Sequence, residues 1–259
     1  MSFWSAVVVA LAGTGAGIIN TIVGSGTLLT FPTLLFFGVN PLVANVSNNI
    51  GLVAGGITGS WGYRHELHGA GPTLRRLLPL SFLGSIAGAG LLLVLPPEAF
   101  KAIVPVLIVI AVALVLAGPA LQRRRAAAEE GIVAGRDPRW HAPAMAIGVF
   151  VAGMYGGYFG AAQGVLLMGL FSVLSSEPLQ RLNGYKNVLA LIVNLVAAAV
   201  FVLFAREHID WLVVLLIAGG SFVGGIIGAR IGRRIPPNAL RALIVVIGVV
   251  AVVRLLWFT

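Results

Sequence analysis

Long apolar segments separated by short polar loops dominate this sequence and restrict the folds it can adopt. A helix needs about 20 apolar residues to cross the roughly 30 Å hydrocarbon core of a bilayer. Segments of that length are expected at residues 3–23, 42–62, 74–95, 99–121, 143–161, 187–205, 211–231 and 238–258. Hydrophobic residues make up 59% of the chain and charged residues 10%, whereas soluble domains have roughly 45–50% and 25%. The sequence therefore predicts an all-α polytopic membrane protein embedded in a lipid bilayer.

Two shorter apolar segments lie between the predicted spans, each beside a run of glycine and small polar residues. They cover Thr27–Gly38 and Gly164–Ser176, which corresponds to roughly 18–20 Å of helix at 1.5 Å per residue. Because this is too short to cross the bilayer upright, each is expected to be a broken or re-entrant helix that pairs with the span before it. Interrupted helices in matching places of two halves are typical of the binding site of a membrane transporter.

The two halves of the chain carry the same motifs in the same order. An SF-x-G-x3-GA pattern at Ser81 returns at Ser221, 140 residues later, and a PP-x-A-x-[KR]-A pattern recurs at the same offset. The asparagine-rich segment 45–49 returns at 183–187 after 138 residues. We therefore expect a duplication in which each repeat has about four spans and one short segment. The expected divisions are a first repeat at 1–121, a linker at 122–142 and a second repeat at 143–259.

The distribution of basic residues predicts how the second repeat is oriented. If the linker is cytoplasmic and the second repeat is inverted, fourteen of the 17 lysines and arginines lie inside and only Lys101, Arg206 and Arg254 lie outside. A parallel repeat would place the arginines of loop 230–241 outside, against the positive-inside rule. Inversion is therefore favoured, with both termini outside. The same rule accounts for the net charge of +9, and no nucleic-acid partner is expected.

The positions of the ionisable residues favour an anion as the substrate. All eight acidic residues and all four histidines fall in predicted loops or at their edges. No span therefore offers a carboxylate for a proton relay, and a cation would meet few protein charges. An anion would be bound well by amides, hydroxyls, helix N-termini and a nearby basic group.

Groups of these kinds gather in the two interrupted hairpins, where we expect them to bind the substrate. The first hairpin contributes Asn20, Thr21, Gly24, Ser25, Gly26, Asn45, Asn48 and Asn49. The second contributes Tyr158, Gln163, Asn183, Tyr185, Lys186 and Asn187. The asparagine-rich segments are interpreted as turns that precede an apolar helix. Lys186 is one of only two lysines in the chain, and the repeat predicts that it lies opposite Asn48 and supplies positive charge.

Each of these residues also has a purely structural interpretation. Glycines allow close helix packing, which is the favoured role for Gly13, Gly17, Gly153 and Gly157 at their small-xxx-small spacing. Asparagines cap helices, tyrosines anchor a protein at the membrane interface, and Lys186 could extend its ammonium group to the cytoplasm.

Enzymatic chemistry has little support in the sequence. There is no HExxH motif, no P-loop and no cysteine. The segment Gly219–Ser221 superficially matches the GxS motif of membrane serine proteases, but no predicted span contains a histidine that could act as the base. We expect a protein that is not an enzyme and has neither a metal nor a cofactor.

Several motifs together resemble the TauE/SafE family of sulfite exporters, which are small duplicated membrane permeases for sulfur-containing and organic anions. These motifs are AGTGAGIINTIVGSGTLLTFPTLL, GVNPLVANVSNN, GMYGGYFGAAQGVLLMGLFSVLS, QRLNGYKNVLALIVN, LGSIAGA and VGGIIGARIGRRIPP. The family commonly has a G-x-G-G-G run where this chain has GSGT. The resemblance implies export of sulfite, sulfoacetate or related sulfonates across a bacterial inner membrane.

The sequence is thus interpreted as a secondary transporter of small sulfur-containing or organic anions. Access to the substrate would alternate around a midplane site between the two broken hairpins. The alternatives left open are an anion channel and a membrane scaffold or assembly factor that transports nothing. A homo-oligomer is also left open.

Overall fold

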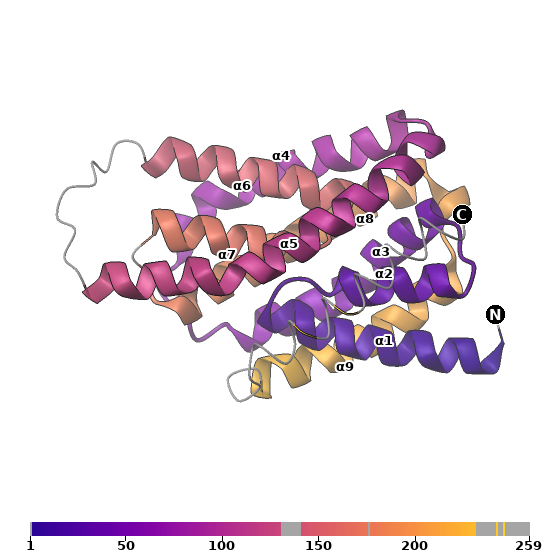
Figure 1. Ribbon diagram of the computed structural model, residues 1–259, viewed down its shortest axis with the longest axis horizontal. Coiled ribbons are helices and arrows are strands. Elements are labelled where there is room, and N and C mark those ends of the chain that lie inside the picture. The colour runs from indigo at the N-terminus through magenta and orange to yellow at the C-terminus, as the bar shows by residue number, and fades with distance from the viewer. Residues whose placement is uncertain (1, 131–140, 176, 232–241, 243–245, 247–259) are drawn as a thin grey trace.

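The computed structural model describes residues 2–130, 141–175 and 177–231, together with residues 242 and 246. The described part consists of helices and their connections (Figure 1). They are α1 (Phe3–Ile22), α2 (Thr27–Phe36), α3 (Pro41–Gly62), α4 (Gly71–Val94), α5 (Pro97–Glu130), α6 (His141–Tyr158), α7 (Gln163–Leu174), α8 (Leu179–Phe204), the 3₁₀ turn η1 (Arg206–His208) and α9 (Trp211–Ile231). The all-α membrane fold is confirmed, while the predicted last span at 238–258 lies outside the described residues.

Five of the described helices are long and apolar enough to cross a membrane. They are α1, α4, α8, α9 and residues 98–117 of α5. The helix α3 has 22 residues but is not among them, because it carries asparagine, serine and threonine side chains that are buried against other helices. The predicted spans at 42–62 and 143–161 correspond to α3 and α6, and α6 falls among the shorter apolar helices, so whether these two cross the membrane stays a prediction.

The short helices α2 and α7 agree with the prediction of broken segments. They contain 10 and 12 residues, or roughly 15 and 18 Å of helix at 1.5 Å per residue, well below the bilayer core. Each packs against the helix before it, α2 on α1 and α7 on α6. The helix α5 continues to Glu130, so the first part of the segment predicted as a linker is helical.

The interpretation of the two asparagine-rich segments as turns is wrong. Residues 45–49 lie inside α3, which begins at Pro41 with the Asn40 side chain accepting a hydrogen bond from the Leu42 amide at 3.0 Å. Residues 183–187 lie inside α8, which begins at Leu179, earlier than the predicted start at 187. A capping asparagine and a proline in the first turn are strong helix-start signals, and the asparagines that follow bond to neighbouring helices instead of forming a turn.

The helices pack into two groups, and each group draws on both halves of the chain. The first group contains α1, α3 and α9, and the second contains α4, α6 and α8. In Figure 1 the pair α4 and α6 runs along the top and the pair α1 and α9 along the bottom. The first helix of each repeat therefore pairs with the fourth helix of the other repeat. The groups meet where α3 packs against α8.

Glycine allows the close contact within each pair. In α4, a Cβ atom added at Gly84 or Gly88 would overlap main-chain atoms of α6, and in α9 one added at Gly224 would overlap main-chain atoms of α1. The packing role predicted for the four glycines of α1 and α6 is confirmed, because a Cβ atom at Gly17 would meet Ser221 of α9 and one at Gly157 would meet Ser85 of α4. The duplicated SF-x-G-x3-GA motif is therefore a helix-packing motif.

The helices α3 and α8, which occupy matching places in the two repeats, run antiparallel. The residues at and after the end of α3 pack on the start of α8, since Gly184 lies against Tyr63 and Leu67. At the other end, Ser47 near the start of α3 accepts a hydrogen bond from the amide of Asp210, which follows α8, at 2.9 Å. This is the arrangement that inverted repeats would give, and the inversion of the second repeat stays a prediction. Which end faces the cytoplasm stays a prediction.

A pair of glycine substitutions in α4 tests the packing of α4 against α6. Gly88→Ala should lower the melting temperature in detergent by roughly 3–10 °C, because overpacking costs about 1–3 kcal/mol and the new methyl group would overlap the Met154 carbonyl group. Gly90→Ala is the control, since a Cβ atom there meets nothing within 4 Å. Equal melting temperatures for the two variants would contradict the close contact.

Candidate functional site

The two helix breaks touch each other in the interior of the molecule. The first break separates α1 from α2, and the second separates α6 from α7. The amide of Gly164 donates a hydrogen bond to the carbonyl oxygen of Gly24 at 2.9 Å. Gly24 has a φ of +85°, and a Cβ atom on either glycine would overlap the Cα atom of the other. Only glycine therefore suits both positions.

The broken end of α1 is bonded by side chains of α8. The Lys186 ammonium group donates hydrogen bonds to the carbonyl oxygens of Asn20 at 3.2 Å and Thr21 at 2.9 Å. The Asn187 amide also donates to the Thr21 oxygen, at 3.3 Å. The last carbonyl groups of a helix have no partner within that helix, and the C-terminal end favours a cation. Lys186 donates to these carbonyl groups and brings a cation to this end of the helix, and Asn187 adds a neutral donor.

The broken end of α6 is bonded in the same way by α3. The Asn45 amide donates a hydrogen bond to the carbonyl oxygen of Tyr158, at 2.9 Å. The hydroxyl group of Tyr155 donates to the carbonyl oxygen of Ala161 in the break itself. Each broken first helix is therefore capped by the third helix of the other repeat, so the two halves depend on each other.

The start of α2 is fixed by Asn48 of α3. Its amide nitrogen donates a hydrogen bond to the Thr27 hydroxyl group at 3.2 Å, and its amide oxygen accepts one from the Thr30 hydroxyl group. Asn48 is 1% exposed, and both ends of its amide are engaged. No hydrogen bond joins it to Lys186 within the described part of the chain, and the expectation that the two lie opposite each other across the site stays a prediction.

Two side chains beside the Gly24–Gly164 contact are buried without a hydrogen-bond partner among the described residues. They are the hydroxyl group of Ser25 and the amide nitrogen of Gln163, whose residues are 0% and 4% exposed. Both lie at the beginning of a short helix, and they are related by the repeat offset of 138. A buried polar group without a partner is costly, so this pair is suited to meet a ligand.

The remaining predicted residues lie around this cluster or in the core. Gly26 precedes α2 as its N-cap residue. The Asn49 amide donates to Asn194 at 3.4 Å. Tyr158 packs on Phe100, and Tyr185 packs edge-on against Phe171. The amide oxygen of Asn183 is buried and has no partner among the described residues. Tyr185 is therefore a core residue of the α7–α8 contact.

Three contributors were missed or undervalued at the sequence level. Gly164 was noted only as the start of a short segment, although its place in the repeat matches that of Gly26. Thr30 lies one helical turn after Thr27, and this spacing could have indicated a common partner for the two hydroxyl groups. Asn194 lies deep inside α8, and no local pattern distinguishes it from a residue that packs.

Apolar helices, two broken helices and a buried polar cluster where the breaks meet define a multi-pass membrane transporter. The family described as sulfite exporter TauE/SafE matches residues 9–255. This chain belongs to the TauE/SafE family, as the sequence motifs predicted.

Curated relatives agree with this assignment. The "Probable membrane transporter protein ORF9" of Sinorhizobium sp is 27% identical over 249 residues, covering 93% of this chain and 88% of the relative. The "Probable membrane transporter protein YfcA" of Escherichia coli strain K12 is 24% identical, covering 93% of this chain and 86% of the relative. A "Probable membrane transporter protein" of Haemophilus influenzae is 24% identical, with 93% and 91% covered. No solved structure matches the chain.

Two glycine substitutions separate backbone strain from close contact at the breaks. Gly24 and Gly38 both have positive φ, but a Cβ atom at Gly38 meets nothing within 4 Å. Gly38→Ala should cost only the left-handed strain of about 1–2 kcal/mol. Gly24→Ala should cost about 1–3 kcal/mol more because of overpacking against Gly164. Thermal unfolding in detergent measures the difference, and equal losses would exclude the contact between the breaks.

Proposed function

We propose that this protein is a secondary transporter that exports small sulfur-containing or organic anions, such as sulfite or sulfonates, across a bacterial inner membrane. The observation that carries the proposal is a buried lysine between the broken helices with no carboxylate on the surrounding helices. The family description, sulfite exporter, supports both the class of substrate and the direction.

The charge around Lys186 favours an anion over a cation. Lys186 is fully buried, and two main-chain oxygens accept from its ammonium group, which has three donors. The helices α1 to α4 and α6 to α9 contain no Asp or Glu. A buried charge without a counter-ion is unfavourable, and a bound anion would supply that counter-ion. A cation would instead be repelled.

The hydrogen bonds of the site narrow the set of groups that would bind the anion. The amides of Asn45 and Asn48 already bond to helix ends and threonines. Among the described residues, three groups with unused donors lie beside the Gly24–Gly164 contact, namely the Ser25 hydroxyl, the Gln163 amide and the third N–H of Lys186, while the Tyr158 hydroxyl is also buried without a partner. We therefore assign first contact with the substrate oxygens to these three side chains. The two asparagines hold the broken helices in place.

The burial of the site supports alternating access as the mechanism. Ser25, Asn48 and Lys186 are at most 1% exposed, so a substrate can reach them only after helices move. The natural moving units are the two packed groups, α1 with α3 and α9, and α4 with α6 and α8. In this proposal the groups shift at the α3–α8 contact, and the sequence repeats do not move as separate blocks.

Replacing Lys186 tests the proposed anion site. In proteoliposomes, Lys186→Met should weaken saturable uptake of sulfite or methanesulfonate roughly tenfold to a hundredfold, because a hydrogen bond to a charged group contributes about 1.5–3 kcal/mol. Arg206→Met is the matched control, since it removes a positive charge from an exposed side chain outside the site. Unchanged flux and affinity in Lys186→Met would overturn the role of the lysine.

Two further readouts separate this function from its alternatives. A transporter should show saturable flux, whereas flux that rises linearly with concentration would indicate an anion channel. Bound anions should raise the melting temperature of the purified parent protein. No anion-specific shift with sulfite, sulfonates, sulfate or carboxylates would favour a scaffold without a substrate. Because Lys186→Met also removes two helix-capping bonds, its melting temperature without anion must be measured alongside.

A further inference from the structure

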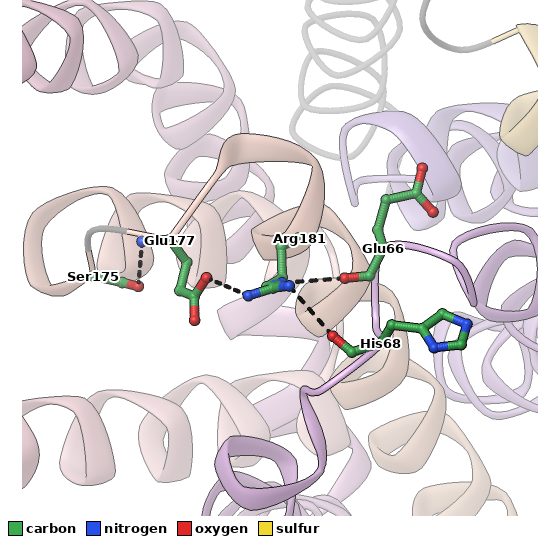
Figure 2. A network of polar contacts seen from close by, with 5 residues as sticks. All are labelled: Glu66, His68, Ser175, Glu177 and Arg181. Carbon is green, nitrogen blue, oxygen red and sulfur yellow. Dashed lines mark hydrogen bonds and ion pairs between the residues drawn. The ribbon is translucent and has the colours of Figure 1, made fainter.

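Arg181 at the start of α8 connects three segments of the chain (Figure 2). It forms an ion pair with Glu177 at 2.9 Å, just before α8. It also donates hydrogen bonds to the carbonyl oxygens of Glu66 and His68, each at 3.3 Å. These two residues belong to the loop between α3 and α4. In the sequence Arg181 appeared only as one of the basic residues on the predicted cytoplasmic side.

The loop held by Arg181 lies over the part of α8 that precedes Lys186. Its Leu67 packs against Gly184 of α8, between Arg181 and Lys186 in the sequence. Lys186 follows Arg181 by five positions in α8, or roughly 7.5 Å along the helix. The loop also joins the two packed groups, because α3 belongs to the first and α4 to the second. A movement between the groups must therefore displace this loop.

A second connection between the two packed groups lies at the opposite end of the molecule, and it is held by different contacts. The link between α8 and α9 bonds to α3 through the Asp210 amide and the Ser47 hydroxyl group. The Asp210 side chain caps α9 by accepting from the amides of Leu212 and Val213. The repeat places Val43 at the position that matches Arg181. The ion-paired arginine is therefore a feature of one end only.

We infer that Arg181 is a latch that keeps this end of the transporter closed and must release the α3–α4 loop before the site opens there. The inference rests on the alternating access proposed above. The Arg181 and Glu177 side chains are 36% and 35% exposed, and exposed ion pairs are weak. Such a contact can break and re-form during each transport cycle, which a fully buried ion pair would resist.

The latch can be tested by thiol labelling, because the chain has no cysteine. Ala70→Cys places a reporter in the loop held by Arg181, and Ala205→Cys places a matched reporter in the link at the opposite end. The two alanines are 2% and 1% exposed. A charged methanethiosulfonate reagent then reports how often each position reaches water, in the parent and in Arg181→Gln.

Arg181→Gln should raise the labelling rate at Ala70→Cys roughly threefold to tenfold, the range expected from losing one exposed ion pair and its hydrogen bonds. The rate at Ala205→Cys should stay the same or fall, because opening one end closes the other. Glu177→Gln removes the ion pair but keeps the two hydrogen bonds from Arg181 to the loop, so it should raise the rate at Ala70→Cys by a smaller factor. If Arg181→Gln does not fold, Glu177→Gln provides the test of the latch.

An unchanged rate at Ala70→Cys in folded Arg181→Gln overturns the latch. Equal increases at both reporters also overturn it, since they indicate general loosening. The labelling needs no substrate, so it stands apart from the assay of Lys186→Met. If anion transport fails while the labelling responds at one end only, the proposed substrate class is wrong and the latch stands. If transport is confirmed while the labelling does not respond, the latch alone is wrong.

Discussion

A helix that ends inside a membrane protein leaves carbonyl groups that water cannot reach, and satisfying them is the constraint on which this structure depends. Both α1 and α6 end in this way. Lys186 and Asn187 bond to the end of α1, and Asn45 bonds to the end of α6. In each case the donor comes from the other half of the chain. Neither half can complete its broken helix without the other, which explains why the repeats interlock.

The same constraint gives Lys186 two roles at once. Its ammonium group neutralises the partial negative charge at the end of α1, and it brings a positive charge to the place where Gly24 meets Gly164. A neutral asparagine at the matching position, Asn48, bonds to two threonines instead. The matching positions of the two repeats therefore differ in charge, and in the function proposed above this places the positive charge on one side of the site.

The packing of the helices decides what can move. Glycines bring α1 against α9 and α4 against α6 so closely that added methyl groups would overlap the main chain, so these pairs are expected to move as rigid units. The contact between α3 and α8 instead includes the hydrogen bond between Asn49 and Asn194, and the connections that cross it lie at opposite ends. Arg181 strengthens one of these ends (Figure 2). Two rigid helix pairs on either side of the α3–α8 contact fit the alternating access proposed above.

The sequence alone determined the membrane class, the helices, the two breaks and the family, because apolar length and glycine-rich interruptions are local properties of the chain. It also predicted Gly24, Ser25, Gln163 and Lys186 as site residues, because they lie in the interrupted hairpins, and their contact with a substrate stays a prediction. It could not determine that Asn45 bonds to the end of α6 or that Lys186 bonds to the end of α1, because these bonds join residues far apart in the chain. Only the tertiary structure decided which polar groups were used in capping and which remained for a ligand. The reason is that the buried ends of α1 and α6 take their donors from the other half of the chain.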